Sequence, residues 1–557
     1  MASPTKDLEE KLKHERERAE ENDAKRRAEK LGVSYLDLVS VRTPTEIKAM
    51  AALPETEAKK GLLVPLQILK KKLVVAVFDP NLKETKKIVD ELRKTYEVQI
   101  YIVSKRSLTH AWEHYKYVLP TAKEITHGVE VSEANLEKIR KGVKILTDLE
   151  KEIKNFEGPA VSQILEIILG GASALGASDI HLEPSEKNYI LRLRLDGLLQ
   201  TAGEIDKTIA KPVLNRIKLL SGLKLNIADK PQDGRFTIHL EKRDIEVRTS
   251  VIPSEFGETV AMRILDPISL KTNLGELGFR ADDLEIAKSE IDKPNGLILN
   301  TGPTGSGKTT TLYAFLRSVY KPEIKIITIE DPIEYHLSGI SQTQVDPDAG
   351  YTFASGLRSI LRQDPDVVLV GEIRDEETAE IALNASLTGH MVFSTLHTND
   401  AVGAIPRLID LGAKTQILGP GLSLIIAQRL VRKLCAECKK PKKLDEKTKS
   451  KIEKFIESLP KRVLRKPYEK FSVYEPGSCA KCNNSGFKGR TSIFELFLVN
   501  QVVEEAIYKN ATEIDLKRLA KVQGMVTMQE DGVLKALMGL TSFEEVERLT
   551  GSIVWSS

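Results

Sequence analysis

The sequence predicts an α/β protein of three or more domains, and three observations support this prediction. The chain of 557 residues is too long for one hydrophobic core. Apolar and amphipathic segments alternate over residues 280–432, as in a parallel sheet with crossover helices. Residues 156–267 begin with an apolar helix and continue as alternating strand-like segments, which is typical of an α+β domain.

The composition narrows the class of protein. The chain is 41% hydrophobic and 29% charged with a net charge of +3, whereas a dedicated DNA-binding protein usually has a clearer basic excess. It contains no apolar run of about 18 residues or more, and its first residues lack the apolar core of a signal peptide. We therefore predict a cytoplasmic protein that acts at a membrane, if at all, through partners.

The N-terminal region divides into three predicted segments. Residues 1–30 carry balanced charges and are expected to form a charged helical or disordered arm. Residues 31–125 are expected to form a small α/β domain, since a strand, an amphipathic helix and a second strand follow one another within residues 72–104. Residues 126–155 are charged and weakly helical, as in a linker.

A phosphate-binding loop follows an apolar strand in "GLILNTGPTGSGKTT". Its spacing fits the pattern G-x-x-x-x-G-K-[ST], in which backbone N–H groups and a helix N-terminus hold phosphate oxygens. Lys308 is expected to reach the β- and γ-phosphates of a nucleoside triphosphate, and Thr309 to bind Mg²⁺. The candidate nucleotide-binding residues are Gly302, Pro303, Thr304, Gly305, Ser306, Gly307, Lys308, Thr309 and Thr310.

Three further strands end in polar residues. "PDVVLVGEIRD" delivers Glu372, which can support Mg²⁺ through a metal-bound water. "IITIEDPIEY" delivers Glu330, Asp331 and Glu334, one of which can orient or deprotonate the attacking water; spacing alone does not choose among them. "GHMVFSTLHTND" places His397 just past a strand end, where it can sense the γ-phosphate.

The four cysteines predict a structural metal site. They form two CxxC pairs, which in a reducing compartment indicate metal binding rather than disulfides. Four thiolates suffice for a closed tetrahedral Zn²⁺ site without a catalytic position. The intervening "EKTKSKIEKFIESL" is expected to form a helix of its own. The predicted ligands are Cys435, Cys438, Cys479 and Cys482.

The motifs together resemble those of the ATPases of type II secretion and type IV pilus assembly. The similarity rests on "GPTGSGKTTTLY", "TIEDPIEY", "LRQDPDVVLVGEIRD" and "LTGHMVFSTLHTNDA", with "ASDIHLEP", "PQDGR" and "CAKCNNSGFKGRTSIFEL" on either side, over roughly residues 30–550. The resemblance implies a PAS-like domain at 156–267, a RecA-like ATPase domain at 268–432, a tetracysteine metal-binding domain at 433–495 and a helical C-terminal domain at 496–557.

The resemblance also implies residue roles. Glu334 matches the catalytic glutamate, Glu372 the glutamate that supports Mg²⁺, and His397 the second histidine of the His box. Arginines of the PAS-like domain approach the phosphates in this family, and an arginine fork suits charge on a transferring phosphoryl group. The candidate arginines here are Arg192, Arg194 and Arg235.

These relationships imply a homo-hexamer that hydrolyses ATP and passes force to an inner-membrane platform protein and cytoplasmic-face assembly proteins. The tetracysteine segment and the large N-terminal domain favour fibre assembly over retraction, with pilus assembly as the main interpretation and type II secretion as the alternative. A nucleic-acid motor and a nucleotide-gated scaffold are the other classes, and no direct nucleic-acid contact is expected. Because the longer cyclic di-GMP motif of some relatives has no good match, we predict no such site.

Overall fold

The computed structural model describes most of the chain in two separate compact units, Met1–Thr126 and His127–Ser557. No helix among the described residues is long and apolar enough to cross a membrane. Of the predicted linker over residues 126–155, the structure describes 128–129, 138–139 and 141–155, whereas the predicted boundaries near residues 125 and 267 lie outside the described residues. The described ranges are 4–40, 46–50, 52–69, 72–93, 96–117, 128–129, 138–139, 141–156, 161–240, 243–266 and 272–555.

The first unit is a small α/β fold around a three-stranded sheet of order β1-β2-β3. The predicted strand, helix and second strand are present as β2, α4 and β3, and the sheet also contains β1, which runs antiparallel to β2. Helix α1 packs Ala24 and Ala28 against this unit, and its Glu21 accepts hydrogen bonds from Tyr35 and Ser104. The elements are α1 (Pro4–Leu31), α2 (Ile47–Met50), α3 (Glu55–Lys60), β1 (Leu63–Leu69), β2 (Lys72–Val77), α4 (Lys83–Leu92), β3 (Glu97–Ile102), α5 (Lys105–Trp112) and η1 (Glu113–Tyr117).

The second unit begins with a largely antiparallel sheet of order β4-β8-β9-β10-β5-β6-β7. Along β6, buried and half-buried residues alternate, so one face packs on helices α7 to α9 and the other carries polar side chains. This is the α+β region that the sequence predicts. Its elements are β4 (Gly128–Val129), α7 (Leu146–Lys154), α8 (Val161–Ala174), β5 (Asp179–Pro184), β6 (Asn188–Leu195), β7 (Leu198–Asp206), α9 (Lys207–Leu220), β8 (Gln232–Leu240), β9 (Arg243–Ser254) and β10 (Gly257–Leu265).

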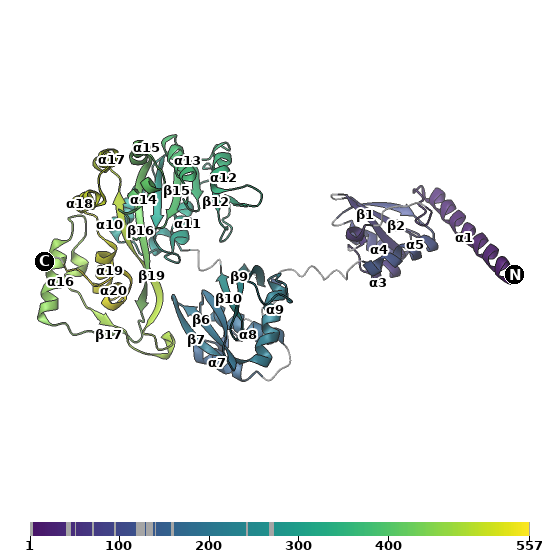
Figure 1. Ribbon diagram of the computed structural model, residues 1–557, viewed down its shortest axis with the longest axis horizontal. Helices are drawn as coiled ribbons and strands as arrows, with labels where there is room; N and C mark the ends of the chain where they lie inside the picture. Colours follow the sequence, from purple (N-terminus) through teal and green to yellow (C-terminus); the bar gives the residue numbers. More distant parts are fainter. Residues whose placement is uncertain are drawn as a thin grey trace. The chain divides into compact units, whose positions relative to one another are not determined.

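A second seven-stranded sheet, of order β13-β12-β14-β15-β11-β16-β19, forms the centre of the region that follows (Figure 1). Neighbouring strands are parallel except for β16 and β19. Helices cover both faces, since α12, α13 and α15 contribute to one core and α10 and α11 to the other. The elements are η3 (Leu274–Glu276), α10 (Ala281–Ile291), β11 (Gly296–Thr301), α11 (Lys308–Val319), β12 (Ile326–Glu330), β13 (Ser341–Gln344), α12 (Phe353–Leu361), β14 (Val367–Val370), α13 (Glu376–Leu387), β15 (Met391–Leu396), α14 (Ala404–Asp410), α15 (Thr415–Gly421) and β16 (Leu422–Leu434).

The chain from residue 435 onward adds the cysteine segment and the C-terminal helices. Helix α16 forms where the sequence predicts it and packs with α19 in a separate core. Strand β19 then returns to the central sheet, so this segment interrupts the connection between two paired strands. The elements are β17 (Lys440–Pro441), α16 (Glu446–Ser458), η4 (Lys466–Tyr468), β18 (Tyr474–Glu475), η5 (Ala480–Cys482), β19 (Phe487–Leu498), α17 (Gln501–Tyr508), α18 (Glu513–Val522), α19 (Met528–Leu537) and α20 (Phe543–Thr550).

Candidate functional site

The phosphate loop joins β11 to α11, as predicted. Gly302 and Gly307 have φ of 148° and 93°, and a Cβ on either would lie 2.5 Å and 2.8 Å from atoms of Gln428. These positions therefore need glycine. Lys308 Nζ donates to the carbonyl oxygens of Gly302 (2.7 Å) and Pro303 (3.2 Å), so the ammonium lies across the loop. Burial lowers the pKa of Lys308, and the negative charge of Glu372 opposes that effect.

This loop fits a nucleotide with Mg²⁺. Ser306 Oγ is buried and has no hydrogen-bond partner among the described residues, which leaves a free polar atom inside the cradle. Thr309 is the second residue of α11, and its hydroxyl is a hard oxygen ligand of the kind that Mg²⁺ prefers. The helix N-terminus supplies further N–H groups for phosphate oxygens.

Glu372 and His397 meet at the ends of two neighbouring strands. β14 delivers Glu372 and β15 delivers His397, and His397 Nε2 lies 3.3 Å from Glu372 Oε2. Arg374 pairs with the other carboxylate oxygen at 2.5 Å. Burial alone would raise the pKa of Glu372, but the hydrogen bond and charge of Arg374, together with His397, bring it below its ordinary value. Glu372 is therefore held ionised beside the loop lysine, as a metal-supporting carboxylate requires.

The three carboxylates after β12 have different surroundings. Glu330 is 4% exposed and accepts hydrogen bonds from Tyr313, from Thr328 (2.6 Å) and from Gln342 (3.1 Å). Because both of its oxygens are occupied, Glu330 serves the packing of the strand. Its surroundings leave little room for a reacting water.

Asp331 and Glu334 lie further along the same segment. Asp331 lies 3.8 Å from Arg374, which places it at the edge of the Glu372 pair. Glu334 is half-buried and faces the other sheet of the unit, where Arg248 NH1 lies 3.2 Å from its Oε2. Arg248 NH2 also donates to the carbonyl of Ile333 at 3.1 Å, so one guanidinium holds both groups.

Arg248 is not among the three arginines predicted from the sequence. Arg248 belongs to a cross-strand row on the polar face of the first sheet of the unit. Direct register neighbours make up this row, from β8 to β6: Arg235, Arg248, Arg263, Asp179 and Arg194. The alternation in "DIEVRTSVI" indicates which residues share a face with Arg248. Only the register of β8 with β9 shows that Arg248 lies directly opposite Arg235, a predicted site residue.

The predicted arginines differ in their partners. Arg194 Nε lies 3.2 Å from Asp179, and Arg192 NH1 lies 3.1 Å from Glu183, so both are paired within their own sheet. Arg235 is exposed and has no ion pair within the described ranges. A cavity of about 600 Å³ connects this face to the loop after β12; its lining includes Arg235, Arg248, Arg263, Pro332 and Gln344.

The four cysteines converge as predicted. Their Sγ atoms lie within 4.8 Å of one another, with Cys435–Cys479 at 3.8 Å, Cys438–Cys482 at 3.7 Å and Cys479–Cys482 at 3.6 Å. A tetrahedron with Zn–S bonds of about 2.3 Å has S···S edges of about 3.8 Å. The Gly486 N–H also donates to Cys482 Sγ at 3.3 Å, which favours a thiolate. The donor set therefore fits one tetrahedral ion.

A phosphate loop, a carboxylate beside it and a histidine at the end of a parallel strand are typical of the class of phosphate-loop ATPases. The family model "Type II/IV secretion system protein" matches residues 155–548, and the chain belongs to this family. A second model, "MshEN domain", matches residues 31–121. The chain is an ATP-hydrolysing enzyme of the secretion and pilus ATPases.

Several relatives give this assignment detail. The type II secretion system protein E of Dickeya dadantii is 43% identical over 407 residues, which cover 73% of this chain and 78% of that protein. The type IV pilus assembly ATPase PilB of Myxococcus xanthus is 38% identical over 502 residues, covering 88% of this chain and 85% of that protein. The Legionella pneumophila ATPase DotB shares the fold, with a TM-score of 0.50 and 20% identity over 69% of this chain and 94% of that chain.

Proposed function

We propose that this chain is a cytoplasmic, homo-hexameric ATPase that drives pilin polymerisation through an inner-membrane platform protein. The observation that supports hydrolytic work is the convergence of Lys308, Glu372 and His397 at one edge of the sheet, with Glu334 facing an arginine of the other sheet. Type II secretion is the alternative, because relatives with both names match.

One observation favours pilus assembly between these two. The alignment with the Myxococcus pilus ATPase spans 502 residues, against 407 for the Dickeya secretion protein, although the identity is somewhat lower. Deletion of the gene, scored for surface pili and for secreted proteins, separates the two. Loss of secretion with normal pili would contradict pilus assembly.

In the proposed reaction the loop N–H groups, Lys308 and Thr309 would hold the phosphates and Mg²⁺, which would supply positive charge beside the phosphoryl group. Glu372 would support the ion, and His397 would contact the γ-phosphate. Glu334 orients or deprotonates the attacking water. Arg248 and Arg235 stabilise the charge on the transferring group.

The contact between Arg248 and Glu334 gives this reaction a resting state. While the guanidinium pairs with the carboxylate at 3.2 Å, the arginine covers one oxygen of Glu334. Transfer of the arginine to a phosphate would free Glu334 at the moment when nucleotide is in place. Rigid-body motion between the two sheets would then follow the nucleotide state and supply the stroke.

The proposed catalytic role of Glu334 has a direct test. Glu334→Gln in the purified full chain should keep ATP binding within about twofold and lower kcat by about 10³-fold, since the water loses its base. Glu323→Gln, an exposed glutamate between α11 and β12, is the matched control and should behave like wild type. Wild-type turnover in Glu334→Gln would overturn the assignment.

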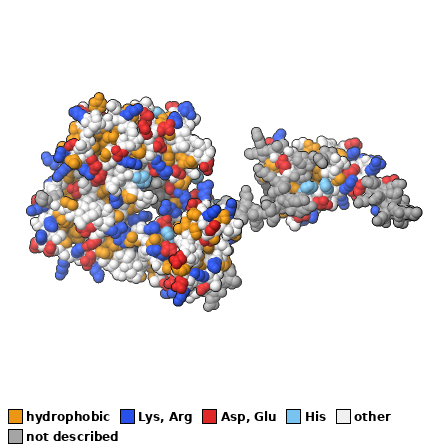
Figure 2. Space-filling view, viewed as in Figure 1, with side chains coloured by type: hydrophobic (Ala, Val, Ile, Leu, Met, Phe, Trp, Pro, Cys, Tyr) orange, Lys and Arg blue, Asp and Glu red, His pale blue; other side chains and the backbone are white. Residues whose placement is uncertain are grey.

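Two other classes make different predictions. A nucleic-acid motor wants a basic, aromatic-bearing channel, whereas Figure 2 shows Lys and Arg interspersed with Asp and Glu over the visible face of the second unit. Stimulation of the ATPase by DNA would favour that class. A nucleotide-gated scaffold would form a hexamer with negligible turnover, which is measured by sizing the protein and assaying phosphate release.

We also propose that Cys435, Cys438, Cys479 and Cys482 bind Zn²⁺ in a structural role. The sulfur distances carry this proposal. Metal analysis of the purified protein should find about one zinc per chain. Cys479→Ser and Cys482→Ser together should remove it and lower the thermal midpoint.

A further inference from the structure

A buried glutamate outside the nucleotide site connects that site to the C-terminal helices. Glu495 lies on β19 and is 5% exposed. Its Oε1 accepts the backbone N–H of Ala401 at 2.9 Å, and its Oε2 accepts the backbone N–H of Met528 at 3.2 Å. Ala401 lies four positions after His397, and Met528 is the first residue of α19. One carboxylate therefore joins the histidine loop to a C-terminal helix.

The loop that follows His397 is also bonded to the strand that leads into the phosphate loop. Thr301, the last residue of β11, hydrogen-bonds to Thr398 through both the Thr398 hydroxyl (2.7 Å) and the Thr398 N–H (2.8 Å). The Thr398 hydroxyl also contacts the carbonyl of Asp400 at 2.8 Å, immediately before Ala401. Thr301, Ala427 and Glu495 are register neighbours across β11, β16 and β19. The last residue of β11, which leads into the phosphate loop, and Glu495 thus lie in one cross-strand row of the sheet.

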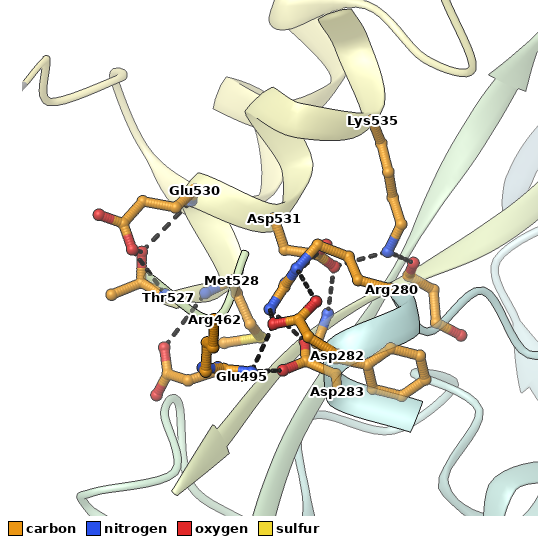
Figure 3. A network of polar contacts seen from close by, with 12 residues as sticks. Arg280, Asp282, Asp283, Arg462, Glu495, Thr527, Met528, Glu530, Asp531 and Lys535 are labelled. Carbon is orange, nitrogen blue, oxygen red and sulfur yellow. Dashed lines mark hydrogen bonds and ion pairs between the residues drawn. The ribbon is translucent and has the colours of Figure 1, made fainter. Parts of the chain in front are cut away.

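The helix side is anchored by a polar network (Figure 3). Asp531 accepts from Arg280 (3.0 Å) and from the Phe494 N–H (2.8 Å), and Lys535 donates to Asp531 and to the Ser492 carbonyl. α19 is therefore bound along its length to β19 and to the start of the ATPase region.

The same network includes the cysteine segment. Arg462, which lies between the two CxxC pairs, donates to Asp282 and Asp283 and to the Gly524 carbonyl just before α19. Figure 3 shows Arg280, Asp282 and Arg462 converging beneath α19. A displacement of the start of α19 would therefore also shift the bonds that Arg462 of the cysteine segment makes.

We propose that Glu495 is a positioning residue that couples the His397 loop to α19 and so carries the nucleotide state to the C-terminal helices. Each oxygen holds one backbone donor from one of the two elements, so a shift of one must be accommodated by the other. The proposal rests on ATP binding at the site above, and it does not depend on which fibre is built.

The test uses hydrogen exchange of the full chain with and without a non-hydrolysable ATP analogue and Mg²⁺. In wild type the analogue should slow exchange both at residues 397–403 and at the start of α19. In Glu495→Gln the amide offers one acceptor, and its NH₂ faces a backbone donor, so one of the two bonds is lost. The loop should still respond, whereas the α19 response should fall at least about fivefold.

A second pair of variants cuts the link from the other side. Met528→Pro removes the N–H that Glu495 accepts, and proline suits the first position of a helix. The preceding Thr527 has φ −70° and ψ 159°, which is compatible with a following proline. Met528→Ala also loses the buried side chain but keeps the N–H. Met528→Pro should lose the α19 response and Met528→Ala should keep it.

The outcomes are distinct. Equal α19 responses in wild type, Glu495→Gln and Met528→Pro would overturn the coupling, as would a wild-type α19 that ignores the analogue. If Glu495→Gln fails to fold, as judged by its thermal midpoint, the Met528 pair decides. Failure of the analogue to bind in wild type would instead count against the ATPase site itself.

Discussion

The two large sheets of the second unit bring functional residues together in different ways. In the ATPase sheet, β11 and β15 are buried along their whole length, and the candidate site residues follow the strand ends. In the first sheet, β6 alternates between buried and half-buried residues, and its arginines lie on an open face. A parallel sheet gathers function at an edge, whereas an antiparallel sheet gathers it in rows across strands.

Of the changes that test this comparison, loss of Arg248 from the cross-strand row has the largest expected effect. Arg248→Ala should lower kcat/KM by about 10²-fold, since it removes one preorganised donor for the transition-state charge. Arg263→Ala is the matched control, because Arg263 occupies the same row one strand away but is 57% exposed and pairs with Asp179 at 3.1 Å. Steady-state ATPase assays measure both. Equal losses in the two variants would show that the row acts only through its total charge.

A second prediction contrasts a buried acid, Glu495, with a glutamine at the same position. Burial of Glu495, with the nearby charges of Asp400 and Glu530 and despite two backbone hydrogen bonds, raises its pKa to about 7. The folded state then holds a proton that the unfolded state releases near its ordinary pKa. Stability should therefore fall as pH rises from about 5 to 7, by at most about 3 kcal/mol.

Thermal midpoints measured across this pH range for wild type and Glu495→Gln test that contrast. The variant should show the shallower decline, because Gln does not titrate. Asp283, whose pKa burial raises to about 6, contributes equally to both proteins and cancels in the comparison. Identical pH profiles would contradict the contribution of Glu495.

The smallest expected effect concerns two arginines that the sequence suggested. Arg192→Ala and Arg194→Ala should each change kcat/KM by less than about threefold, because Glu183 and Asp179 already hold these half-buried side chains within their own sheet. ATPase assays beside Arg248→Ala provide the scale. A loss as large as that of Arg248→Ala would mean that the pairs break when nucleotide binds.

Much of the ATPase site was predictable from sequence because its geometry is local. The phosphate loop, Glu372 and His397 each follow an apolar strand, and parallel strands place their carboxyl ends at one edge. The cysteine cluster was predictable for the same reason, since CxxC spacing fixes each pair. The alternation of strands in residues 156–267 likewise gave the α+β region.

The remaining features depend on register and long-range packing. Arg248 joins Arg235 only through the pairing of β8 with β9. Glu330 and Glu334 have the same chemistry in sequence, and only Tyr313 and Gln342 show which of them is occupied. Glu495 meets Ala401 across 94 positions of chain. No periodicity encodes such contacts, because they arise when separate elements pack.

The cysteine cluster also changes what the segment over residues 435–486 means for the sheet. Cys435 directly follows β16, Cys482 shortly precedes β19, and the Cys435 N–H donates to the Gly486 carbonyl at 2.9 Å. A metal held by these thiolates would fix the two ends of this segment close together. Strands β16 and β19 would then be connected as if by a short hairpin turn. Closing a few residues instead of about 50 lowers the entropic cost by roughly 2 kcal/mol. The residues between the two CxxC pairs could then be lengthened or shortened while β19 keeps its register with β16.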